Sequence, residues 1–224
     1  MMGTELSQSI AASGPAWLTG MSPAQFIALL SLMVVGSFTP GPNTTIAAMT
    51  GANFGLRATL PHCIGVAFGF ATLVALCAAG VGALVLASPL LAGIVHAAGV
   101  AYLLWLAFKL ARSATLADKQ VLAPLSVWQS AALQYANIKA WMLALATAAS
   151  YMTNAADPLQ RGLLVCLVFG VFGFLSNGVY GAIGASLRQW LQVGGRIRWF
   201  NRAMGLALAA TALWIAVAGR PVAG

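Results

Sequence analysis

Apolar residues follow one another in long runs that are separated by short polar or basic segments. The runs cover about residues 24–53, 60–86, 89–112, 127–151, 159–187 and 203–218. An α-helix of about 20 apolar residues is long enough to cross the hydrocarbon core of a bilayer. The pattern therefore predicts an all-α membrane protein with six transmembrane helices.

The first run is interrupted by Pro40, Gly41 and Pro42. Two prolines remove backbone donors and clash with the preceding turn, so we expect two half-helices here, one on each side of the break. Backbone freed within lipid is tolerated where it lines a polar cavity. Because Pro42 suits the first turn of a new helix, the N–H groups of Asn43 and Thr44 should point at the break and attract an anion such as a carboxylate.

A lysine stands in the middle of the fourth run. Lys139 lies twelve residues from Val127 and twelve from Tyr151, or about 18 Å from each end of a helix that rises 1.5 Å per residue. Snorkelling to the surface, the alternative to a functional role, is out of reach at that depth. The three acids of the chain, Glu5, Asp118 and Asp157, all fall outside the runs. We therefore expect Lys139 to pair with a substrate carboxylate or to gain and lose a proton.

Two polar neighbours accompany this lysine. Gln134 and Asn137 offer amide donors and acceptors, which suit the charged ends of an amino acid. A plain hydrogen bond between helices is an equally good interpretation of Asn137. We predict a substrate site made of the first break and this face, with Lys139 as the candidate for proton coupling. Its residues are Pro40, Gly41, Pro42, Asn43, Thr44, Gln134, Asn137 and Lys139.

Composition and charge agree with a membrane protein. The chain has 224 residues, of which 61% are hydrophobic and 6% charged, and its mean hydropathy is +0.90. The net charge of +8 does not indicate nucleic-acid binding, because the basic residues lie in short loops. With both termini outside, the cytoplasmic segments carry eight Lys and Arg residues and the external ones two, which satisfies the positive-inside rule.

The organisation predicted is one transmembrane domain, residues 22–220, behind a flexible tail, residues 1–21. A weak repeat relates Val66–Phe70 to Gly170–Phe174, which suggests two inverted three-helix repeats, at about 22–112 and 126–218. Three scattered cysteines and two single histidines give no metal or disulfide pattern. No nucleophile has an evident base, so we expect neither an enzyme nor a cofactor.

The motif Thr39-Pro40-Gly41-Pro42-Asn43 and the segment Asn137-Ile138-Lys139 together resemble the LysE/RhtB family of bacterial amino-acid exporters. The resemblance covers nearly the whole chain and is greatest to the cysteine/O-acetylserine exporters of that family. Ile138 replaces a proline typical of the family, so the fourth helix need not be broken as the first is.

This resemblance implies a multi-pass protein of the bacterial inner membrane that exports small neutral amino acids, driven by protons. The expected partners are the amino acid, protons and lipid, with a homo-oligomer left open. A passive channel for small solutes or anions is the alternative function. It would use the same polar centre without coupling to protons.

Overall fold

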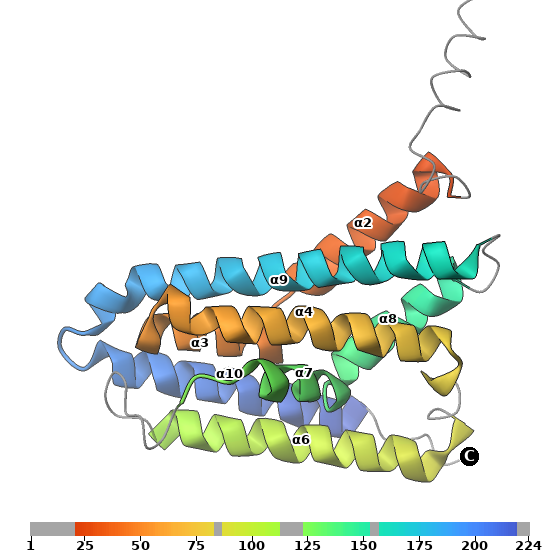
Figure 1. The fold of residues 1–224 in the computed structure, drawn as a ribbon. Helices are drawn as coiled ribbons and strands as arrows, with labels where there is room; N and C mark the ends of the chain where they lie inside the picture. The colour runs from red at the N-terminus through yellow and green to blue at the C-terminus, as the bar shows by residue number, and fades with distance from the viewer. Residues whose placement is uncertain (1–20, 83–86, 113–122, 153–156, 219–224) are drawn as a thin grey trace, which may run out of the picture.

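The computed structural model describes residues 21–82, 87–112, 123–152 and 157–218. The tail predicted for residues 1–21 lies outside the described residues except for Met21. The described residues contain no strand and form the α-helices of Figure 1. These helices are α2 (Pro23–Phe38), α3 (Pro42–Phe54), α4 (Leu56–Ala78), α6 (Pro89–Arg112), α7 (Val127–Tyr135), α8 (Ile138–Tyr151), α9 (Pro158–Leu191) and α10 (Arg196–Ala218).

The long helices lie side by side along one direction, as Figure 1 shows. Helix α9 packs against α3 and α4, α10 packs against α6, and α7 packs against α4. Large apolar side chains such as Leu163, Leu206 and Trp214 face outward on these helices, with more than half of their surface exposed. An apolar exterior of this kind suits a lipid environment rather than water.

Membrane-crossing capacity follows from helix length. Helices α4, α6, α9 and α10 are each long and apolar enough to cross a membrane. Helices α2 and α3 pass the same test together as a pair bent by 54°, which is either a broken span or a re-entrant loop. Helices α7 and α8, with 9 and 14 residues, are each too short to cross alone. The described residues thus supply four or five spans by length and composition, and a sixth requires α7 and α8 to act as one crossing.

The chain breaks twice within predicted spans. Between α2 and α3 the residues Thr39, Pro40 and Gly41 leave the helix. Between α7 and α8 the helix is interrupted at Ala136 and Asn137, and Asn137 takes an extended conformation as the N-cap of α8. The predicted fourth span is therefore divided even though Ile138 stands in place of a proline. The carbonyl of Tyr135 freed there accepts a hydrogen bond of 2.8 Å from Nε1 of Trp141.

Two helices begin earlier than the apolar runs predict. Helix α4 starts at Leu56 because Gly55, in the left-handed region at φ 88°, ends α3 and turns the chain at once. Helix α10 starts at Arg196, ahead of the predicted start at 203. Its first turns carry arginines that pack on aromatic rings, with Arg202 5.5 Å from the centroid of Trp199.

Small residues bring α3 and α9 into close backbone contact. A Cβ atom on Gly184 would overlap the carbonyl of Ala48, and one on Gly51 would overlap the carbonyl of Gly181. The same arrangement joins α4 to α7, where Gly65 faces the carbonyl of Val127. These glycines are therefore required for the backbones to approach.

We predict that Gly184→Ala lowers the thermal unfolding midpoint of the detergent-purified protein by several degrees, because the added methyl meets backbone that cannot move aside. Gly178→Ala on the same helix is the matched control, since no atom lies within 4 Å of the added carbon. The control should hold or slightly raise the midpoint, because alanine favours helix by about 1 kcal/mol. Equal midpoints for the two variants would contradict the proposed packing.

Candidate functional site

The first break frees backbone carbonyls at the end of α2, and side chains from other helices meet them. The hydroxyl of Tyr180 donates to the carbonyl of Phe38 at 2.9 Å. Nζ of Lys139 donates to the carbonyl of Thr39 at 2.7 Å. Both the backbone N–H and the hydroxyl of Thr39 donate to Val35. The break is thus held by α9 and α8 as well as by its own helix.

The start of α3 faces the same break. Gly41 is the N-cap, and its N–H donates to the hydroxyl of Thr44 at 2.9 Å, while that hydroxyl donates to the Gly41 carbonyl at 3.0 Å. Since the helix begins at Pro42, the N–H groups of Asn43 and Thr44 have no acceptor within it. These groups and the helix dipole make the start of α3 favourable for an anion.

Lys139 lies in the first turn of α8 and is partly buried. An ammonium group has three donors, and one of them is used by the Thr39 carbonyl. Within the described residues the acid present is Asp157, which caps the start of α9 by accepting from the N–H of Gln160 at 3.0 Å. Lys139 therefore has no carboxylate partner in the described part of the chain.

A buried amide pair joins α3 to α7. Nδ2 of Asn43 donates to Oε1 of Gln134 at 2.8 Å, and Nε2 of Gln134 donates back to Oδ1 of Asn43 at 3.3 Å. Gln134 also donates to the carbonyl of Ser130 at 2.8 Å. Gln134 is fully buried. The pair fixes the start of α3 against α7.

His62 supports the same segment from α4. Its ring is fully buried, with Nε2 3.1 Å from the carbonyl of Asn43 and Nδ1 2.9 Å from the hydroxyl of Ser130. Because a carbonyl can only accept, the neutral ring carries its proton on Nε2 and accepts from Ser130. His62 shares a helix face with Gly65 and Gly69, which was the available signal that it is buried.

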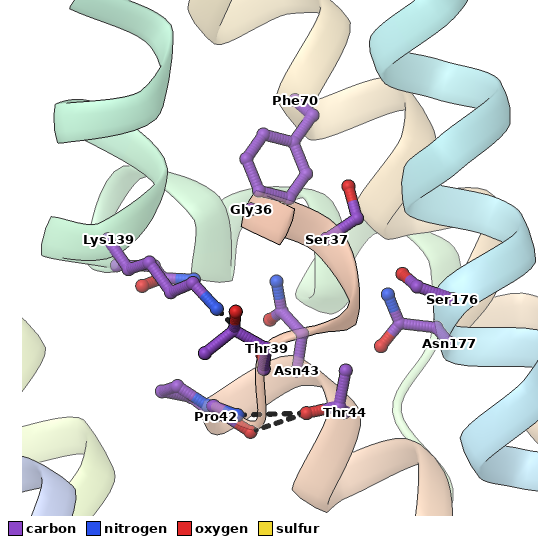
Figure 2. A pocket seen from close by; sticks show the side chains of 12 residues that line it. Gly36, Ser37, Thr39, Pro42, Asn43, Thr44, Phe70, Lys139, Ser176 and Asn177 are labelled. Carbon is purple, nitrogen blue, oxygen red and sulfur yellow. Dashed lines mark hydrogen bonds between the residues drawn. The ribbon is translucent and has the colours of Figure 1, made fainter. Parts of the chain in front are cut away.

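A small cavity lies between the break and α9. It has a volume of about 20 Å³, room for about one water molecule. Figure 2 shows Lys139 reaching the break from α8 and Ser176 and Asn177 approaching from α9. Asn137 and Asn177 each hold a buried side-chain carbonyl oxygen without a hydrogen-bond partner. Unpaired buried acceptors are unusual, so they mark this cavity as a place for a donor.

Most of the predicted site residues meet at this point. Six of them line the cavity, Pro40 lies at the break beside it, and Gln134 stands behind Asn43 without lining the cavity. The sequence did not predict Ser37, Phe70, Ser176 or Asn177 as site residues, and these also line the cavity. The six lining residues are Gly41, Pro42, Asn43, Thr44, Asn137 and Lys139.

Comparisons with known proteins agree with one another. A protein-family model described as LysE type translocator matches residues 34–219. A cysteine/O-acetylserine efflux protein of Escherichia coli (strain K12) is 28% identical over 197 residues, which are 88% of this chain and 98% of that protein. The protein of the same description from Shigella sonnei (strain Ss046) has the same identity and coverage. No solved structure matches the chain significantly.

We predict that His62→Ala destabilises the protein, because it leaves the Asn43 carbonyl and the Ser130 hydroxyl buried without their partner. A loss of about 2–3 kcal/mol corresponds to about 5–10 °C in the unfolding midpoint of the purified protein. His96→Ala, at a partly exposed position on α6, is the control and should change the midpoint little. A His62→Ala midpoint equal to the control would contradict the supporting role.

Proposed function

The chain belongs to the LysE type translocator family, and we propose that it is a secondary active exporter of small neutral amino acids, coupled to protons. The family match confirms the resemblance predicted from the sequence. Amino-acid export is supported by relatives that are described as cysteine/O-acetylserine efflux proteins and that align over nearly their whole length. A multi-pass location in the bacterial inner membrane agrees with the apolar helices.

One observation carries the proposal: the ammonium of Lys139 lies at the first break, 2.7 Å from the Thr39 carbonyl and without a carboxylate partner in the described residues. A substrate carboxylate would replace the carbonyl as the partner of this ammonium. It would also meet the free N–H groups of Asn43 and Thr44 at the start of α3. Charge-assisted hydrogen bonds of this kind are about twice as strong as neutral ones.

The other end of an amino acid carries an ammonium group. The unpartnered carbonyl oxygens of Asn137 and Asn177 suit this donor. Because the cavity holds about one water molecule, an amino acid enters only after the helices move apart. The break between α2 and α3 provides a hinge for that movement.

Proton coupling follows from the same lysine. A cation without a counter-charge is unfavourable within a membrane, so Lys139 is a group that can gain and lose a proton during a transport cycle. In the proposed cycle substrate and proton compete for the site. A proton then moves inward as the amino acid moves outward, as proton-driven export requires.

We further propose six crossings in two inverted repeats, with α7 and α8 acting together as the fourth. Two observations support the inverted repeats. The chain has a second break, between α7 and α8, and the start of α8 has free N–H groups like those at the start of α3. The basic ends of α4, α6, α9 and α10 gather at one end of the molecule in Figure 1. If that end is cytoplasmic, both termini lie outside.

We predict that Lys139→Ala lowers export of the amino acid from loaded proteoliposomes by about tenfold or more, since a hydrogen bond to a charged group contributes about 1.5–3 kcal/mol. Lys109→Ala removes a charge that stacks on Trp105 at the end of α6, with 4.5 Å from Nζ to the ring centroid. This control should export normally. Normal export by purified, folded Lys139→Ala would refute the site.

Lys139→Arg separates charge from proton transfer, because arginine binds carboxylates but does not release its proton. We expect this variant to exchange labelled for unlabelled amino acid across the membrane while failing to accumulate it in response to a pH gradient. Accumulation equal to that of the unchanged protein would exclude Lys139 as the coupling residue. The unchanged protein also separates a carrier from a channel. If its downhill flux is the same with and without a pH gradient, a channel is favoured.

A further inference from the structure

A second hollow lies on the side of the break that faces α8 and α10. It is a groove of about 660 Å³, within the range of about 300–1,000 Å³ found for small-molecule sites. Its floor is the break itself, and its walls include Met142 and Ala146 of α8 and Trp214 and Ile215 of α10. The groove is therefore far larger than the polar cavity beside it.

The groove and the polar cavity share their boundary. Five residues line both, namely Gly36, Thr39, Gly41, Pro42 and Lys139. The ammonium that we assign to the substrate carboxylate thus stands between a polar cavity and a large open groove. Because the polar cavity holds about one water molecule, the side chain of an amino acid held by Lys139 has room only on the groove side.

The groove is apolar apart from this boundary. Thr211 is the exception on α10, and its hydroxyl already donates to the carbonyl of Ala207 at 2.8 Å. A charged or hydrogen-bonding substrate group would lose its water there, and beyond the shared boundary the Thr211 hydroxyl and the indole N–H of Trp214 are the polar side-chain groups among the lining residues to replace it. An apolar side chain loses nothing by entering, and it gains contact with Met142 and Trp214, which are otherwise 65% and 69% exposed.

We infer that this groove is the side-chain subsite of the transported amino acid. The transported class then extends from small neutral amino acids to those with longer apolar side chains, which bind more tightly. The inference rests on the proposed function, because it assumes that Lys139 holds the carboxylate. An acyl chain of a lipid is the competing occupant. Lipid does not account for the ammonium on the groove floor, whereas an amino acid joins a carboxylate to an apolar side chain within one molecule.

A straight-chain series of amino acids tests this in proteoliposomes. Alanine, 2-aminobutyrate, norvaline and norleucine compete with a labelled substrate in counterflow, with serine as a polar substrate of similar size to 2-aminobutyrate. Affinity should rise by about fourfold for each added methylene that is buried, and serine should bind more weakly than 2-aminobutyrate. If affinity stays constant or falls along the series, the inference is overturned while the proposed amino-acid export stands. If no amino acid gives counterflow, both the inference and the proposed export are overturned.

Filling the groove tests its location. Ala146→Phe places a ring in the groove from an exposed position on α8, so the ratio of norleucine to alanine affinity should fall at least about tenfold, toward one. Ala182→Phe is the matched control, because Ala182 is exposed on α9, which contributes no residue to the groove. An unchanged ratio in the Ala146→Phe protein, with correct folding, overturns the assignment.

Brominated lipids distinguish an amino acid from lipid in the groove. Brominated lipids quench tryptophan fluorescence on contact. Comparison with the Trp214→Phe variant gives the part of this quenching that comes from Trp214. Norleucine should reduce that part in the otherwise unchanged protein, because its side chain displaces lipid from the groove. If Trp214 is quenched equally with and without norleucine, lipid occupies the groove during binding and the inference fails.

Discussion

Backbone groups freed inside a membrane need partners, and the structure is organised around meeting this need at the break between α2 and α3. Lys139, from the far half of the chain, binds the carbonyl of Thr39, and Tyr180 binds that of Phe38. Each contact joins helices that are distant in the sequence. The chain thus uses the same groups to hold the break and to place a positive charge beside it.

The buried polar network at the start of α3 and the polar groups at the cavity differ in their hydrogen bonding. Asn43 and Gln134 satisfy each other, and His62 fixes the carbonyl of Asn43 against Ser130. These groups are buried and paired, so they hold the start of α3 rigidly. Asn137 and Asn177 instead keep an unpaired oxygen at the cavity. In the proposed site, the paired polar groups position the start of α3, and the unpaired oxygens are the groups that a ligand could meet.

The sequence predicted those features that one or two residues determine locally. Pro40 and Pro42 do not fit the interior of a helix, and Lys139 cannot reach a surface from the middle of its run, so these three residues indicated where the proposed site lies. The division of the predicted fourth span was not predictable, because Ile138 is compatible with a helix. The contacts at this break come from elsewhere: Trp141 donates to the Tyr135 carbonyl, and Gly99 of α6 lies against the carbonyl of Ala136. The role of His62 likewise depends on Ser130, which lies 68 positions away. Pairings over such distances leave no local pattern.

The glycine contacts between α3 and α9 have a consequence for how the site opens. Carbonyls of one helix lie where side chains of the other would stand, so these two helices move as a single body. At Gly36, by contrast, α2 meets the flexible end of a leucine side chain on α8, that of Leu143. In the proposed transport cycle, these contacts favour a change of access in which α2 and α8 turn against the α3–α9 pair.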